Sequence, residues 1–141
     1  MDVVLDDRLV IEELLVGLDR RGAHLHTTSY WYYRACRAAV AGGAGHLSGP
    51  FRELPIDEQR RAIASMLQLP EEIGLPQPRH VVPLMVAAAG RHPKLNLLNL
   101  EAVAAAQFLG ATVWLSPEGA RGILPGVLAT ESIPWREVAP M

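Results

Sequence analysis

The sequence is poor in cysteine and lysine, and it has no apolar run long enough to cross a bilayer. Because Cys36 is the only cysteine, an internal disulfide is excluded, which agrees with a reducing cytoplasm. Lys94 is the only lysine, and 13 basic residues against 15 acidic ones give a net charge of −2. This balance provides no broad cationic field for nucleic acid, so any RNA contact must come from local arginine clusters. The chain opens with acidic residues rather than a signal peptide, and we expect a cytoplasmic protein with no membrane partner.

What the sequence does contain is enough apolar material for one core. It has 141 residues, of which 50% are hydrophobic, and this excludes a disordered chain. The run Gly-Gly-Ala-Gly-His-Leu-Ser-Gly-Pro at 42–50 is the strongest helix and strand breaker. We therefore predict a single domain over residues 1–141 with a flexible loop near 42–50.

Short apolar runs alternate along the chain with segments of helical periodicity. The predicted helices lie at 8–18, 30–41, 56–69, 80–90, 98–109 and 117–129. The predicted strands lie at 3–5, 24–28, 111–115 and 133–138, the last of them at an edge because Pro134 cannot donate to a ladder. This order predicts an α/β fold with three α/β/α layers and a mostly parallel central sheet. Ligands gather at the carboxyl ends of such strands, where the sequence places Asp6 and Ser116.

Two segments carry a resemblance to a known family. Residues 3–6, Val-Val-Leu-Asp, suit a buried strand that ends in an acid. Residues 99–117 combine an Ala-rich helix ending at Gly110 with an apolar strand and a polar turn. Together they resemble the PIN-like nuclease domain, and the resemblance runs from Val3 to Val138. It implies a PIN-like fold and a ring of carboxylates that holds Mg²⁺ or Mn²⁺ for RNA cleavage, with the toxin of a bacterial toxin–antitoxin pair as one form of that activity.

The acidic residues of the family pattern are only partly present. Its four acidic positions fall, in chain order, on Asp6, Arg34, Asn99, and Ser116 or Pro117. Acids remain close to the third and fourth positions, so the candidate catalytic residues are Asp6, Asn99, Glu101 and Glu118. Among these, Asp6 is the candidate metal ligand if the site is active.

The charges at the four positions of the family pattern distinguish two hypotheses for the function, one without a bound metal ion and one with it. Mg²⁺ at a phosphodiester needs octahedral oxygen ligands, usually including two or more carboxylates. A guanidinium about 4 Å from a divalent ion is repelled by several kcal/mol at an effective dielectric near 20. If Arg34 points inward, we expect it to pair with Asp6 in place of a metal. The preferred hypothesis is a degenerate PIN-like protein that needs no cofactor and binds a partner or RNA without cleaving it.

The alternative hypothesis keeps the metal and the ribonuclease activity. Small shifts would let Asp7, Glu101 and Glu118 replace the missing acids around Mg²⁺ or Mn²⁺. Three of the candidate residues also have a plain structural role. Asp6 suits the N-cap of the first helix, Asn99 suits a helix cap, and Glu101 suits a first turn, where the helix dipole favours an acid.

Four consecutive aromatic residues at 30–33 are the oddest local feature of the sequence. They cover more than one helical turn, so they cannot all face one core. Beside the two arginines that follow, they suit either stacked bases of single-stranded RNA or a protein interface. The acidic net charge favours an interface with a protein partner or a second copy. The candidate binding residues are Tyr30, Trp31, Arg34 and Arg37.

A pair of histidines is a weaker signal. His24 and His26 lie two residues apart and so on one face of a predicted strand, a spacing that metal sites use. No third ligand lies nearby in the sequence, and the pair alone does not predict a zinc site.

Overall fold

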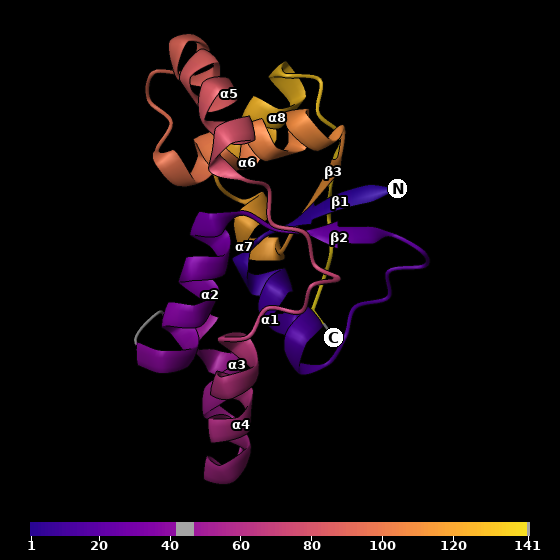
Figure 1. Cartoon of the computed structure of the whole chain (residues 1–141), viewed down its shortest axis with the longest axis vertical. Helices are drawn as coiled ribbons and strands as arrows, with labels where there is room; N and C mark the ends of the chain where they lie inside the picture. Colours follow the sequence, from indigo (N-terminus) through magenta and orange to yellow (C-terminus); the bar gives the residue numbers. More distant parts are fainter. Residues whose placement is uncertain (42–46, 141) are drawn as a thin grey trace.

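The computed structural model describes residues 1–41 and 47–140 and contains a four-stranded, all-parallel sheet (Figure 1). Its strands are β1 (Asp2–Leu5), β2 (His24–His26), β3 (Thr112–Leu115) and β4 (Trp135–Glu137). They lie in the order β2-β1-β3-β4, so β4 is at an edge as predicted. The chain passes from β1 outward to β2 and later returns to the other side of β1 with β3. This reversal places a topological switch point between β1 and β3, where α/β sheets bind ligands.

Eight helices connect and cover the strands within the described residues. They are α1 (Asp7–Leu15), α2 (Ser29–Ala41), α3 (Gly49–Arg52), α4 (Ile56–Met66), α5 (Pro78–Arg91), α6 (Leu97–Leu109), α7 (Pro117–Ala120) and α8 (Leu124–Thr130). In Figure 1, α5, α6 and α8 gather at one end of the molecule, and α1 to α4 gather at the other. No helix in this part of the chain is long and apolar enough to cross a membrane.

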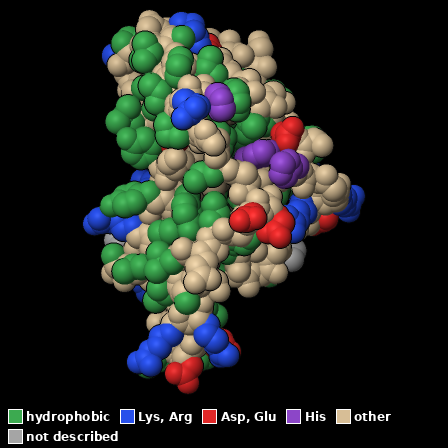
Figure 2. All heavy atoms as spheres, viewed as in Figure 1, with side chains coloured by type: hydrophobic (Ala, Val, Ile, Leu, Met, Phe, Trp, Pro, Cys, Tyr) green, Lys and Arg blue, Asp and Glu red, His purple; other side chains and the backbone are tan. Residues whose placement is uncertain are grey.

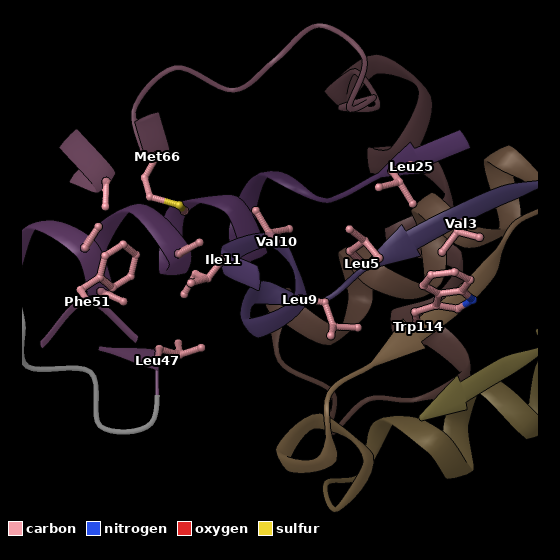
Figure 3. Packing of buried hydrophobic residues seen from close by; sticks show 14 of the residues in the cluster. Val3, Leu5, Leu9, Val10, Ile11, Leu25, Leu47, Phe51, Met66 and Trp114 are labelled. Carbon is pink, nitrogen blue, oxygen red and sulfur yellow. The ribbon is translucent and has the colours of Figure 1, made fainter. Parts of the chain in front are cut away.

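Each face of the sheet packs against its own set of helices. Val3, Leu5 and Trp114 lie in a buried cluster with side chains from α1 to α4, part of which is drawn in Figure 3. Val4 and Val113 lie in a second cluster, with side chains from α6 and α8. Alternate strand residues therefore point to opposite helical layers. This arrangement confirms the three-layer α/β/α fold predicted from the sequence.

Among the predicted elements, the helix at 117–129 departs most from the structure. The predicted helix at 117–129 is divided into α7 and α8, because Pro125 in the first turn of α8 has no N–H to continue a helical ladder. The predicted flexible loop at 42–50 is only partly within the described residues, since 42–46 lie outside them. In the remainder, Leu47 and Ser48 are buried, and α3 begins at Gly49.

Candidate functional site

A cavity of about 260 Å³ lies at the carboxyl ends of the parallel strands, beside the switch point. The sequence-predicted residues that line it are Asp6, Trp31, Arg34, Asn99 and Glu118. Asp7 also lines it, whereas Glu101, Tyr30 and Arg37 do not. The structure thus brings together three of the four candidate catalytic residues and two of the four candidate binding residues. We call this cavity the strand-end pocket.

Asp6 is buried and has hydrogen bonds on both carboxylate oxygens. It is the N-cap of α1, and its Oδ1 accepts from the backbone N–H of Leu9 at 3.0 Å. Its Oδ2 accepts from the backbone N–H and the hydroxyl of Ser116, at 2.8 and 2.7 Å. These bonds tie the end of β1 to the end of β3. The N-cap role expected from the sequence is therefore present, and Ser116 adds a partner that the sequence only placed nearby.

Burial shapes the ionisation of Asp6 and the space around it. Burial, reinforced by the negative charge of Asp7, raises the pKa of the Asp6 carboxyl to about 6, although the bonds from Ser116 and Leu9 oppose the shift. Gly119 approaches so closely that a Cβ there would lie 2.5 Å from Asp6 Oδ2. Only glycine fits this contact without displacing the carboxylate. Asp6 is therefore held in one position by its partners.

Arg34 pairs with Asp7 and not with Asp6, so the expected Asp6–Arg34 contact is wrong. The Arg34 Nε donates to Asp7 Oδ2 at 2.8 Å, and the backbone N–H of Arg8 donates to Asp7 Oδ1 at 2.8 Å. The reason is the helix start: the N-cap turns Asp6 toward β3, whereas Asp7, the first residue of α1, faces α2. The positive charge still lies in the strand-end pocket. It neutralises the neighbouring acid instead of the expected one.

Glu101 serves a different helix from the one expected. Its two carboxylate oxygens accept from the backbone N–H groups of Ser29 and Tyr30, at 3.1 and 2.9 Å. It thereby caps the N-terminus of α2 from α6, where the helix dipole favours a negative charge. The expected role as a dipole partner in the first turn of its own helix is wrong. This buried carboxylate lies outside the strand-end pocket and is occupied by backbone donors.

Asn99 also differs from its expected role as a helix cap. The N-cap of α6 is Asn96, whose side chain accepts from the backbone N–H of Asn99 at 2.9 Å. Asn99 therefore lies in the first turn of α6 and lines the strand-end pocket. Glu118, in α7, lines the same pocket and is exposed.

The carboxylates of the strand-end pocket do not form a compact metal-ligand cluster. Among the described residues, three ligand atoms within 4.8 Å of one another occur only at Asp2, His24 and His26, which lie elsewhere. Asp6 is fixed by hydrogen bonds, and one oxygen of Asp7 is paired with Arg34. The residues present therefore fit Mg²⁺ or Mn²⁺ poorly, because a bound ion would have to displace existing partners and face a guanidinium.

The four consecutive aromatic residues divide among different surroundings. Trp31 is buried against the β1–β3 face, and the hydroxyl of Tyr32 donates to the backbone carbonyl of Met66 at 2.7 Å. Tyr30 and Tyr33 are exposed at opposite ends of the run. Trp31 thus supports the pocket wall, and Tyr30 belongs to an apolar groove described below.

Comparison with solved structures identifies the fold. The chain is similar to a 2.2 Å structure of VapBC-1 from nontypeable Haemophilus influenzae, with a TM-score of 0.56 and 14% sequence identity. The match covers 97% of this chain and 98% of the other. The fold is PIN-like. No protein-family model matches the sequence, and no curated protein sequence matches it significantly. The similarity to a PIN-like fold therefore rests on the arrangement of the helices and strands in space.

Proposed function

We propose that this PIN-like protein binds a partner protein and does not cleave RNA. The observation that carries the proposal is the ion pair between Arg34 and Asp7 inside the strand-end pocket. The resemblance to PIN-like nucleases implies an acid at position 34, and the chain has a guanidinium there. A metal-dependent nuclease concentrates negative charge around its ion. In this pocket the positive charge of Arg34 neutralises the negative charge of Asp7.

The surface beside the pocket suits a protein partner. An apolar groove of about 540 Å³ lies between α5, α6 and the start of α2. Tyr30, Val82, Val86 and Leu97 line it and are 40 to 68% exposed. Figure 2 shows hydrophobic side chains gathered on this side of the molecule. Exposed apolar patches with an aromatic residue are typical of protein interfaces.

Other features point in the same direction. The net charge of −2 gives no broad attraction for a polyanion, which favours protein over RNA. The PIN-like resemblance implies membership in a toxin–antitoxin pair as one possibility, and the fold is similar to that of VapBC-1. The protein partner is either a second copy of the chain or a separate protein.

A metal-dependent ribonuclease is the second candidate, favoured by one observation. Asp6, Asp7 and Glu118 all line the strand-end pocket, so three carboxylates border one volume. One or two protein carboxylates with water and substrate phosphate are enough for some Mg²⁺ sites. In this hypothesis the ion would have to displace Arg34 from Asp7.

Metal and RNA assays test the choice. Mn²⁺ and Mg²⁺ are titrated calorimetrically into the protein, and single-stranded RNA is incubated with the protein and Mn²⁺. The variants are Asp6→Asn and a matched control, Asp57→Asn, which removes an exposed carboxylate in the first turn of α4. We expect intact RNA and no Asp6-dependent heat. RNA cleavage lost in Asp6→Asn and kept in Asp57→Asn would establish the ribonuclease instead.

Sedimentation velocity and RNA binding test the partner. If the partner is a second copy, Val86→Glu in the apolar groove abolishes self-association. Ile56→Glu is the control, since it adds the same charge at an exposed apolar residue of α4. Fluorescence anisotropy with labelled single-stranded RNA forms the second arm. Saturable RNA binding that is lost in Arg34→Ala would replace the protein partner with RNA.

A further inference from the structure

Three metal-ligating side chains meet beside the start of β1, where it pairs with β2, at the end of β1 away from the strand-end pocket. The parallel register pairs Asp2 with His24 and Val4 with His26. Directly paired residues, and residues two apart on one strand, share a face of a sheet. Asp2, His24 and His26 therefore project from the same face. Figure 2 shows histidine side chains beside an acidic one in this region.

The distances among these groups are close to those of a metal site. Asp2 Oδ1 lies 2.9 Å from His26 Nε2 and 3.2 Å from His24 Nδ1. All three ligand atoms lie within 4.8 Å of one another. A tetrahedral ion with bonds of 2.0–2.1 Å separates neighbouring ligand atoms by about 3.3 Å. Only small side-chain movements separate the observed cluster from that geometry.

One histidine of the cluster is fixed in place. The His26 side chain is 8% exposed, and its ring packs against the backbone of Gly74 so closely that a Cβ there would lie 2.1 Å from Nδ1. Backbone hydrogen bonds join Gly74 to both neighbours of His26: its N–H donates to Leu25 at 2.8 Å and its carbonyl accepts from Thr27 at 3.0 Å. The ring therefore has little freedom to turn away from Asp2. A ligand that is already oriented binds with less loss of conformational freedom.

The other two ligands are open to solvent. The side chains of His24 and Asp2 are 61% and 42% exposed, so an ion can reach the cluster without unfolding of the sheet.

We propose that Asp2, His24 and His26 form a binding site for a divalent transition-metal ion of the zinc class. Two imidazole nitrogens and one carboxylate oxygen suit Zn²⁺, and water would complete a tetrahedron. The donor set disfavours Mg²⁺, which prefers oxygen ligands in an octahedron. The site is independent of the proposed function, because none of its residues lines the strand-end pocket or the apolar groove.

Binding at this site would join the first two strands of the sheet. Asp2 lies at the start of β1 and the histidines lie on β2, which is an edge strand. An ion that binds only the folded chain stabilises it by RT ln(1 + [Zn²⁺]/Kd), so the stabilisation grows with the logarithm of the Zn²⁺ concentration once that exceeds Kd. The thermal midpoint of unfolding should therefore rise as the Zn²⁺ concentration rises.

Calorimetry and cobalt spectroscopy on untagged, chelator-treated full-length protein test the site. We expect one Zn²⁺ per chain, and visible absorption bands of tetrahedral intensity when Co²⁺ is added. His24→Gln and Asp2→Asn should each weaken Zn²⁺ binding at least about tenfold and shift the Zn²⁺-dependent rise in the thermal midpoint to at least about tenfold higher Zn²⁺ concentration. His24 is largely exposed, so its variant tests the ligand without disturbing the core.

Two control variants separate this site from other binding. His80→Gln removes an exposed histidine that stacks on Phe108, and Asp6→Asn removes the buried acid of the strand-end pocket. Both should bind Zn²⁺ like the unaltered protein. Binding that His24→Gln leaves unchanged would overturn the proposal. So would the absence of saturable Zn²⁺ binding, or a stoichiometry of one ion per two chains.

Discussion

Reversing the charge at position 34 should turn the strand-end pocket into a metal site. In Arg34→Glu the guanidinium that pairs with Asp7 is replaced by a carboxylate, which is the residue type that the PIN-like resemblance implies there. We expect Mn²⁺ to bind this variant at least about tenfold more tightly than the unaltered protein.

The magnitude follows from the geometry of the ion pair. Arg34 Nε lies 2.8 Å from Asp7 Oδ2, and an ion on that oxygen would be about 2.1 Å from it. The ion and the guanidinium nitrogen could therefore be no more than about 5 Å apart. At that separation the repulsion is about 1.7 kcal/mol in bulk water and about 7 kcal/mol at an effective dielectric of 20. Because the Arg34 side chain is 48% exposed, the lower value is the safer basis, and it corresponds to about eighteenfold in affinity.

The assay is calorimetric titration of Mn²⁺, with Mg²⁺ as a competitor. The matched control is Arg37→Glu, which makes the same charge change one turn further along α2 at an exposed residue outside the pocket. Equal affinities of the two variants would show that general charge, and not the ion pair in the pocket, governs metal binding. Tight, Asp6-dependent binding by the unaltered protein would refute the reasoning altogether.

Three further predictions concern stability, each measured by urea unfolding. Burial raises the pKa of Asp6 to about 6, so its carboxyl binds a proton more tightly in the folded state than in the unfolded state. The free energy of unfolding should therefore fall by up to about 3 kcal/mol as the pH rises from 4 to above 6. Asp6→Asn should flatten this pH dependence. Glu101→Ala leaves two backbone N–H groups of α2 without their buried acceptor and should cost about 1–3 kcal/mol, whereas a loss below about 0.5 kcal/mol would contradict the capping role. Gly119→Ala should cost about 1–3 kcal/mol through overlap with Asp6, while Gly126→Ala, which meets no atom within 4 Å, should be neutral or stabilising.

The fold could be predicted because its signals are local. The apolar runs at β1 and β3 and the helical periodicity between them required no knowledge of contacts, and helix-length connections imply parallel strands. The same reasoning placed Asp6 and Ser116 at neighbouring strand ends, and the structure joins them by two hydrogen bonds. The sequence was enough wherever a residue's place at the end of a predicted strand also determined its partner.

The partners of the charged residues could not be predicted in the same way. Asp6 and Asp7 are adjacent in sequence, and only the cap geometry decides which of them faces Arg34. Glu101 caps a helix that begins 72 residues earlier, so its role depends on how α6 packs against α2. The register between β1 and β2 places Asp2 beside His24 and His26. A shift of one residue would have moved it to the other face of the sheet.

The two ends of the sheet differ in a way that bears on function. At the carboxyl ends, where a PIN-like nuclease would hold its ion, each buried acid already has fixed partners: Ser116 and a backbone N–H for Asp6, and Arg34 for Asp7. Near the start of β1, Asp2 Oδ1 lies 2.9 and 3.2 Å from ring nitrogens of two imidazoles, and an ion could be bound by all three atoms. Metal affinity depends on ligands that a cation can occupy without breaking stronger contacts. On that criterion the acids at the carboxyl ends are poorly placed to bind a metal ion, whereas Asp2, His24 and His26 of the proposed site are better placed to do so.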